Sequence, residues 1–252
     1  MCLVAFSWKN HPKYPLILSA NRDEFFDRPT QPLHRWENGI VAGKDLRGGG
    51  TWMGFHPNGK WSFLTNYRDF SKLSTAKTSR GKLVQDYLEG NQDPETYLKS
   101  ILSKKEDYDG FNLLVSDGER LFYFSNYEDE IREIPPGIHV LSNGLINDPW
   151  PKVNLAKEQL ANLELTDISI EHLLEILKST KRYPIGVLPK TGISASMEIG
   201  LSSQLIRLPP NYGTVSATAV LVNQNRETKI TERTFDWDQS VFSDQSISFT
   251  TL

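Results

Sequence analysis

The sequence predicts one α+β domain spanning residues 1–252, in which two β-sheets carry helices on their outer faces. Strand-like apolar runs fill both ends of the chain, whereas the middle carries helix start and stop signals. No linker, internal repeat or low-complexity tract interrupts the 252 residues. This order of strands, helices and strands is typical of an α+β domain whose sheets use both ends of the chain.

Turn residues between apolar runs predict three β-hairpins. The predicted turns are Pro57-Asn58-Gly59, Asp117-Gly118 and residues 223–225. Two further strands, MCLVAFSW and YPLILSANRDEF, are separated by the turn-like KNHPK. The chain therefore begins with two strands that are close in sequence.

Four helices are predicted in the middle of the chain. Ser79 is a candidate cap for a helix that stops at Gly90, and Asp93-Pro94 opens a second helix reaching about Lys104. Pro151 opens a third over 151–165, and the fourth covers 170–179. Residues 181–213 hold four prolines and four glycines, which predicts a long loop around a short helical piece.

Composition narrows the class of protein. Twenty-eight Lys and Arg against 31 Asp and Glu give a net charge of −3, which offers no general attraction to nucleic acid or anionic lipid. A single cysteine cannot form an internal disulfide, and no apolar run reaches the ~20 residues of a membrane span. The N-terminus shows no basic leader with a cleavage site, so we expect a cytoplasmic protein. The five histidines lack metal-ligand spacing, which predicts neither a metal site nor another resident cofactor.

Cys2 is the only cysteine and the second residue of the chain. One interpretation is a small residue packed in the first strand, since cysteine is often buried. The other is a nucleophile: removal of Met1 would leave a free α-amino group with a pKa of about 7.7–8.0 beside the thiol. Nucleophile and base would then belong to one residue.

Polar residues follow the apolar run PLIL in the second strand. Alternation places Asn21 and Asp23 on one face of this strand and Arg22 on the other. The run is compatible with an edge strand that turns into a loop. It is also compatible with a functional site, in which Asp23 accepts a hydrogen bond from a protonated amine and Asn21 contacts the substrate. Arg22 would lower a thiol pKa if a bulge turned it inward.

Other polar residues lie where strands end. Asn66 and Asn143 are either turn residues or oxyanion donors, because an amide N–H needs no proton transfer. Three glycines precede Trp52, which predicts a mobile loop or a close approach of two backbones. Solvated loop charges and anion contacts are alternative interpretations of Lys44, Arg47 and Arg68.

The order of these motifs is more specific than any one of them. Met-Cys at the start is followed by Asn-Arg-Asp-Glu, Gly-Lys-Asp with Gly-Gly-Thr-Trp, Thr-Asn-Tyr-Arg and Leu-Ser-Asn-Gly. In this order the chain closely resembles the NRDE family, also called the transport and Golgi organisation protein 2 family. The resemblance runs from Met1 to about Arg233.

The resemblance implies a four-layer αββα sandwich, like that of N-terminal nucleophile hydrolases, and most closely the cysteine acylases that act on penicillin V and bile salts. By position, Cys2 would be the nucleophile, Asp23 with Asn21 the polar pair, and Asn66 and Asn143 the oxyanion and substrate asparagines. The acylases also carry an inward arginine just before that pair, where this chain has Ser19 or Ala20. Val215 stands where the family usually has an arginine, which leaves Arg207 and Arg233 as candidate replacements.

Three interpretations of the function remain. One of them is a scaffold whose pocket has no activity, and the other two give the pocket a role. The first is an N-terminal cysteine amidohydrolase acting on a non-peptide C–N amide bond of a small molecule. The second is non-catalytic transfer of haem, as cargo, or of an acyl-CoA-like hydrophobic anion, which the resemblance ties to secretory-pathway organisation. In this second function strand aromatics would line an apolar cavity with cations at its rim: Trp52, Phe55, Trp61 and Phe63 with Lys44, Arg47 or Arg68.

Overall fold

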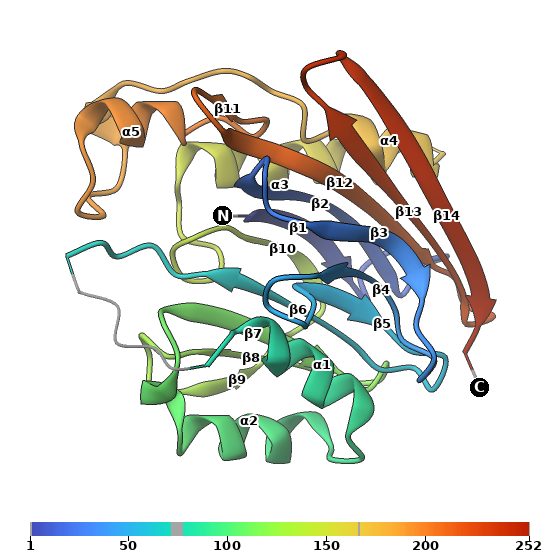
Figure 1. Ribbon diagram of the computed structural model, residues 1–252. Helices are drawn as coiled ribbons and strands as arrows, with labels where there is room; N and C mark the ends of the chain where they lie inside the picture. The colour runs from blue at the N-terminus through green and yellow to red at the C-terminus, as the bar shows by residue number, and fades with distance from the viewer. Residues whose placement is uncertain (1, 72–77, 166, 252) are drawn as a thin grey trace. The chain divides into compact units, whose positions relative to one another are not determined.

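The computed structural model describes residues 2–71, 78–165 and 167–251, whose contacts group into two compact units (Figure 1). Unit 1 comprises Met1–Asp27, Arg68–Lys72 and Pro136–Ser248. Unit 2 comprises Arg28–Tyr67, Leu73–Pro135 and Phe249–Leu252. Each unit therefore draws on separate stretches of the chain. That the 252 residues act as a single domain stays a prediction.

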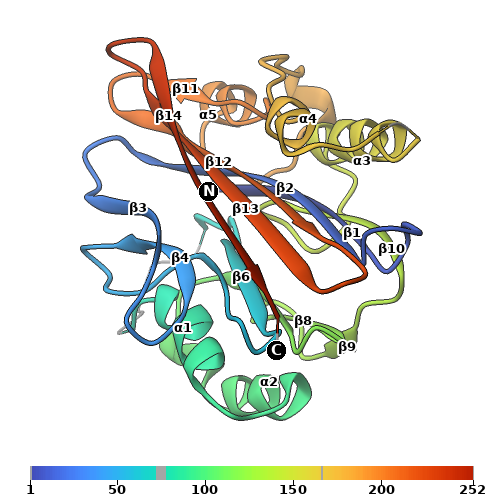
Figure 2. The same ribbon diagram turned by 90° about the vertical axis from the view of Figure 1, so that its right-hand side faces the viewer.

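Unit 1 contains a seven-stranded antiparallel sheet in the order β10-β1-β2-β12-β13-β14, with β11 paired to β12. The long neighbours β2, β12, β13 and β14 run side by side in both views (Figures 1 and 2). Strands from the beginning and the end of the chain thus share one sheet, as predicted. Its strands are β1 (Cys2–Trp8), β2 (Leu16–Phe25), β10 (Gly137–Leu141), β11 (Arg207–Leu208), β12 (Tyr212–Val222), β13 (Glu227–Asp236) and β14 (Val241–Thr250).

Two helices cover one face of the unit 1 sheet. Helix α3 (Pro151–Leu163) packs on β10 and β1, and α4 (Ile170–Glu175) packs on β12, β13 and β2. Odd-numbered strand residues such as Leu3 and Ile17 point to this face and form a buried core with Ala156 and Leu173 of the helices. The connection after α4 holds the short 3₁₀ turn η2 (Ile185–Val187) and helix α5 (Ala195–Gly200). Alternation along the strands thus decides which side chains meet the helices.

Unit 2 contains a meander in the order β3-β4-β5-β6-β7-β8-β9, in which each strand pairs with the next along the chain. Helices α1 (Gly81–Glu89) and α2 (Pro94–Leu102) pack on one face of this sheet, and the 3₁₀ turn η1 (Lys105–Asp107) follows α2. A second buried core lies between them and includes Tyr87, Leu98 and Phe124. The strands are β3 (Thr30–Arg35), β4 (Val41–Asp45), β5 (Met53–Phe55), β6 (Trp61–Asn66), β7 (Phe111–Ser116), β8 (Leu121–Ser125) and β9 (Ile131–Glu133).

The predicted helices form, with small shifts at their ends. Asp93 caps α2 by accepting from the Thr96 N–H at 3.2 Å, and Gly90 ends α1. The prediction that Ser79 caps α1 was wrong. The N-cap position is occupied by Arg80, and no side chain accepts a hydrogen bond from the first backbone N–H groups of this helix. Helix α4 stops at Glu175, earlier than the predicted 179.

The three predicted hairpins form at β5–β6, β7–β8 and β12–β13. The glycine-rich stretch before Trp52 shows the predicted close approach of backbones. A Cβ on Gly50 would lie 2.4 Å from the carbonyl carbon of Gly81, at the start of α1. Only glycine fits there.

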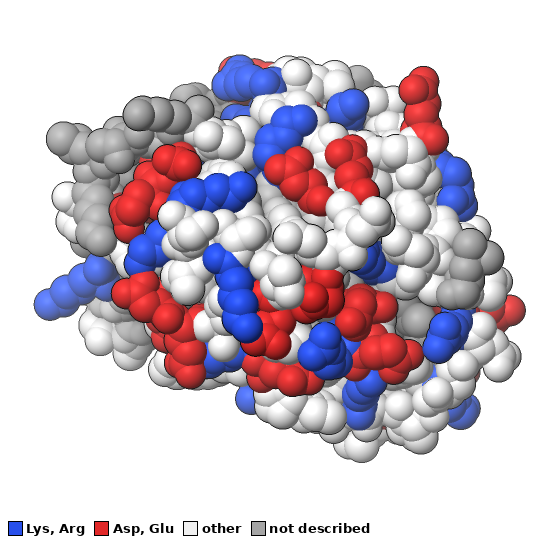
Figure 3. All heavy atoms as spheres, turned by 90° about the horizontal axis from the view of Figure 1, so that it is seen from below, with Lys and Arg blue, Asp and Glu red and all other residues white. Residues whose placement is uncertain are grey.

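The α+β class is confirmed. Each unit contains one antiparallel sheet with helices on one face, which are the kinds and number of layers that the predicted αββα sandwich requires. On the face seen in Figure 3, acidic and basic side chains are interspersed, in keeping with the nearly balanced composition.

Candidate active site

Cys2 begins β1, a strand that lies inside the unit 1 sheet between β10 and β2. Its side chain is buried, with 8% of the residue exposed. The register places Cys2 directly opposite Arg22 and Leu3 opposite Asn21. Cross-strand partners share a face, so the thiol and the Arg22 side chain lie on the face away from the helices.

Asn21 lies on the helical face, as its pairing with Leu3 requires. Its amide nitrogen donates to the carbonyl oxygen of Leu177 at 2.9 Å and to that of Gln204 at 3.0 Å. These two carbonyls bracket the connection that holds η2 and α5. Asn21 therefore ties together the two ends of that connection, and a contact with substrate stays a prediction.

Asp23 is 1% exposed and lies opposite Thr214 of β12. Its Oδ1 accepts a hydrogen bond from the Thr214 hydroxyl at 2.7 Å. The register between β2 and β12 shifts between Thr214 and Ser216, so Val215 is the extra residue of a β-bulge. The bulge thus lies where β12 passes Arg22 and Asp23.

Lys152 also belongs to this region, and no motif in the sequence pointed to it. It is the second residue of α3, is 2% exposed, and its Nζ donates to the Leu201 carbonyl at 3.1 Å. Burial lowers the pKa of Lys152 to about 8, while the charges of Asp23 and Cys2 act in the opposite direction. The amine is therefore close enough to both groups to interact electrostatically with them.

The groups around Cys2 change the pKa of its thiol in opposing directions. Burial raises this pKa, and the negative charge of Asp23 adds to the increase. The positive charge of Arg22 and a backbone hydrogen bond from Asp23 lower it. Burial also raises the pKa of the Asp23 carboxyl, against the charges of Lys152 and Arg22 and the bond from Thr214. The thiol, the carboxyl and two cations form one coupled set.

Asn143 is fully buried and follows β10 beside the start of β1. The neighbouring Ser142 hydroxyl donates to the Cys2 carbonyl at 3.1 Å. The Asn143 carbonyl accepts from the backbone N–H of Arg68 at 2.7 Å. The structure therefore brings Cys2, Arg22, Asp23 and Asn143 to one end of the unit 1 sheet.

Arg68 lies in the same unit and is also buried. Its Nη2 donates to Glu198 of α5 at 2.8 Å, and its guanidinium lies 4.8 Å from the centre of the Trp150 ring. A pocket of about 200 Å³, part of it open to solvent, is lined by these three residues together with Pro151, Lys152, Leu188, Pro189, Leu201 and Ser202. Lys152 thus connects the pocket with the Cys2 region.

The sequence profile of the transport and Golgi organisation 2 family matches residues 1–237. The chain belongs to this family. The human transport and Golgi organization protein 2 homolog is 32% identical over 99% of both chains, and the mouse homolog is 31% identical over the same share. Among solved structures, the chain is similar to a Caenorhabditis elegans N-acylethanolamine-hydrolyzing acid amidase ortholog. That similarity has a TM-score of 0.49 at 11% identity and covers 87% of this chain and 92% of the other.

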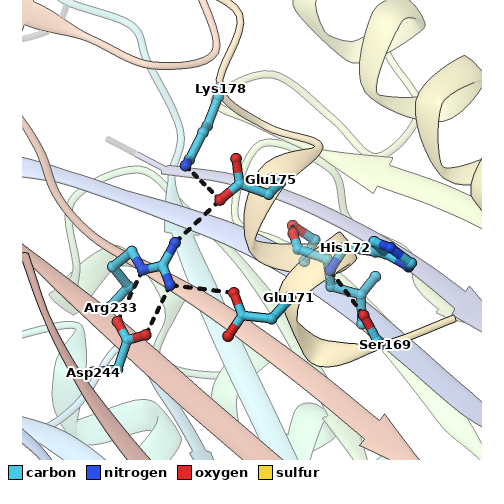
Figure 4. A network of polar contacts seen from close by, with 9 residues as sticks. Ser169, Glu171, His172, Glu175, Lys178, Arg233 and Asp244 are labelled. Carbon is cyan, nitrogen blue, oxygen red and sulfur yellow. Dashed lines mark hydrogen bonds and ion pairs between the residues drawn. The ribbon is translucent and has the colours of Figure 1, made fainter.

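Two arginines were candidates for the charge that the transport and Golgi organisation 2 family usually carries at the position of Val215. Arg233 instead binds acidic residues on the helical face (Figure 4). It donates to Asp244 at 2.8 and 2.9 Å and to Glu175 at 3.1 Å, and it pairs with Glu171 at 3.4 Å. Arg207 places its guanidinium 5.3 Å from the centre of the Trp237 ring. Arg233 is therefore engaged by acidic residues outside the Cys2 region. Trp237 donates to the Thr214 carbonyl at 2.7 Å, so Arg207 lies beside the bulge, and its role as the replacement stays a prediction.

The other residues singled out from the sequence belong to unit 2. Asn66 ends β6 opposite Phe111, and its predicted role at an oxyanion stays a prediction. Lys44 lies 4.8 Å from the centre of the Trp36 ring, Arg47 is exposed, and the Trp52 carbonyl accepts from the Leu64 N–H at 2.8 Å.

Three of the four strand aromatics proposed to line a cavity form a buried stack in unit 2, and the fourth, Trp52, is half-buried. The ring of Trp61 lies 6.3 Å from that of Phe55 and 6.2 Å from that of Phe63, between ring centres. Transfer of haem or an acyl-CoA-like anion stays a prediction.

The described residues, in the ranges 2–71, 78–165 and 167–251, contain neither a metal-binding cluster nor a membrane-spanning helix. No group of three or more His, Cys, Asp or Glu side chains in them is arranged to hold a metal ion. No helix in those ranges is long and apolar enough to cross a membrane.

Proposed function

We propose that this chain is an N-terminal cysteine amidohydrolase that cleaves a linear, non-peptide amide of a small molecule. Removal of Met1 frees the α-amino group of Cys2. The thiol sulfur attacks the amide carbonyl, and its proton passes through that amino group to the departing amine as the C–N bond breaks. Water then hydrolyses the thioester, which yields a carboxylic acid and restores the thiol.

The observation that carries this proposal is the electrostatic setting of Cys2. Its thiol interacts with the charges of Asp23 and Arg22, and Lys152 interacts with both the thiol and Asp23. A cysteine that only fills space in a strand has no need of a buried carboxyl and a buried amine beside it. Burying such charges is costly, and perturbed groups of this kind gather at functional sites.

Each neighbour has a distinct role in this mechanism. Asp23 accepts a hydrogen bond from the protonated α-amino group. The positive charge of Lys152 balances the negative charge of the Asp23 carboxylate. Arg22 shares a face with Cys2 and stabilises the thiolate form. Asn143, buried beside the start of β1, is the donor that stabilises the oxyanion, a contribution that commonly amounts to a factor of 10²–10³ in rate.

The test has two parts. Intact-mass measurement of the protein from its native source identifies the first residue, and we expect Cys2. A panel of fluorogenic acyl amides then measures turnover by the wild type, Cys2→Ala and Cys2→Ser. We expect turnover by the wild type alone, and a thiol-directed acylating probe to label the wild type but not Cys2→Ala.

Retention of Met1 in the native protein would remove the base and overturn the mechanism. Equal turnover by Cys2→Ala would do the same. An Asn143→Ala variant that turns over as fast as the wild type, while unfolding at the same urea concentration, would remove the proposed oxyanion donor.

A further inference from the structure

The connection between α4 and β11 presents apolar side chains to solvent. Ile185 and Val187 of η2 are 47% and 58% exposed, and Met197 of α5, which packs against η2, is 42% exposed. A Cβ on Gly186 would meet no heavy atom within 4 Å, so the turn projects into open space. Figure 1 shows this connection arching over the top of unit 1, from α4 to α5.

Phe70 extends this exposed group. It is 62% exposed, and its backbone N–H donates to the Thr191 carbonyl at 2.8 Å. Four large apolar side chains are therefore held on one connection and the strand end bound to it. We call this group the apolar tip: Phe70, Ile185, Val187 and Met197.

The connection is also strongly basic. Residues 176–197 contain no Asp or Glu, and the next acidic residue, Glu198, is buried against Arg68. The same stretch carries four cations, although the whole chain has a net charge of −3. Three of them are exposed: Lys181, Arg182 and Lys190.

The exposed apolar residues of β14 have a different setting. Val241 and Phe242 of β14 are 53% and 56% exposed, as much as Ile185 and Val187. Residues 234–252 hold three aspartates and no lysine or arginine. Exposure alone is ordinary, since single surface apolar residues need no explanation. The apolar tip differs from β14 in that its cations are exposed: Arg233, 4.0 Å from the centre of the Phe242 ring, is buried and paired with acidic side chains.

Polar contacts fix the connection to the body of unit 1. Asn21 binds the carbonyls at its two ends, Lys152 donates to Leu201, and Arg68 pairs with Glu198. Glu198 in turn accepts from the N–H and hydroxyl of Thr191, at 2.9 and 2.6 Å. The apolar tip is therefore presented on a base held by buried hydrogen bonds.

We propose that the apolar tip docks on an anionic phospholipid bilayer. Its apolar side chains would enter the boundary between headgroups and acyl chains, while Lys181, Arg182 and Lys190 pair with lipid phosphates and carboxylates. A projecting turn suits a bilayer better than a protein partner, because protein interfaces bury broad, well-packed patches and are depleted in lysine. The balanced charge of the whole chain predicted no general attraction to anionic lipid, so the proposal concerns this connection alone.

Vesicle flotation tests the proposal with the full chain and no amide substrate, so its result is independent of the amidohydrolase mechanism. Phosphatidylcholine vesicles are compared with vesicles that also contain phosphatidylserine. We expect binding to the second kind, weakened by added salt because exposed charges are screened. The double variant Lys181→Glu with Arg182→Glu reduces binding more than about 25-fold, since each removed cation is worth about five-fold.

Ile185→Asp with Val187→Asp tests insertion of the apolar residues, and we expect loss of binding even at low salt. Val241→Asp with Phe242→Asp is the matched control, with equal exposure, and we expect it to bind as the wild type does. Absence of wild-type binding to phosphatidylserine vesicles would overturn the proposal. So would full binding by the Ile185→Asp, Val187→Asp variant, or equal loss by the control. Each variant is also checked for wild-type circular dichroism and urea midpoint.

Discussion

Arg68 and Glu198, which lie 130 residues apart in the sequence, form an ion pair of 2.8 Å with both side chains 3% exposed or less. The pair fixes helix α5 against the strand end that leads to Arg68. Removing one partner of a buried pair leaves the other charge uncompensated. We expect Arg68→Met to lower the free energy of unfolding by roughly 3–5 kcal/mol, measured by urea denaturation.

The double variant Arg68→Met with Glu198→Leu separates pairing from packing. It should recover part of the loss, because neither charge is then buried alone. The exposed pair Lys99–Glu95 is the control, and Glu95→Gln should cost about 0.5 kcal/mol or less. A double variant no more stable than Arg68→Met would argue against coupling between the two side chains.

Replacing the charged neighbours of Cys2 should change its thiol reactivity in opposite directions. The charge of Asp23 raises the thiol pKa and that of Arg22 lowers it. Asp23→Asn therefore increases the thiolate fraction at pH 8, and Arg22→Met decreases it. The pH dependence of alkylation by iodoacetamide measures both, and a shift in the same direction for the two variants would contradict this electrostatic account.

Lys152 should make stability increase with pH above neutrality. The folded chain releases this proton near pH 8, whereas the ordinary lysine pKa is 10.5. Between these values the unfolded state binds more protons, so the free energy of unfolding rises with pH, by an amount on the order of 2 kcal/mol. Urea denaturation from pH 7.5 to about 10.5 measures it. The free energy of unfolding should rise less with pH in Lys152→Met, because this variant lacks only the contribution of Lys152 and keeps all other titrating groups. If the two proteins gave parallel curves of unfolding free energy against pH, Lys152 would have the ordinary lysine pKa.

Gly50 and Gly186 form a pair of matched substitutions. A Cβ on Gly50 would lie 2.4 Å from the Gly81 carbonyl carbon, while one on Gly186 meets nothing within 4 Å. Gly50→Ala must push two backbones apart and should cost roughly 1–3 kcal/mol. Gly186→Ala should stay within about 0.5 kcal/mol of the wild type, or stabilise slightly. Thermal unfolding of both variants provides the comparison.

Elements with local chemical signals were predictable from the sequence. Pro151 opens α3, Asp93 caps α2 and Gly90 ends α1, because each acts on backbone groups within a few residues. The alternation that separates Arg22 from Asn21 and Asp23 also holds, because the strand period does not depend on the partner strand.

Features created by distant contacts were not predictable. Strand β14 has a mostly exposed, polar sequence without a clear apolar alternation, and it exists because β13 pairs with it. The bulge at Val215 depends on the register of β12 against β2. From the sequence, Lys152 is expected to be a solvated residue in the first turn of a helix. Its position close to Asp23 depends on tertiary contacts.

The pairing of β2 with β12 has a consequence for the order of events during synthesis. The Thr214 hydroxyl donates a hydrogen bond to Asp23, but Thr214 is added by the ribosome 191 residues after Asp23. At usual elongation rates this takes roughly 10–40 s. For most of that interval the beginning of the chain is outside the ribosome without the strands that will enclose it. An aminopeptidase, an oxidant or a chaperone therefore reaches the first residues as a nascent peptide, before they are enclosed in a sheet.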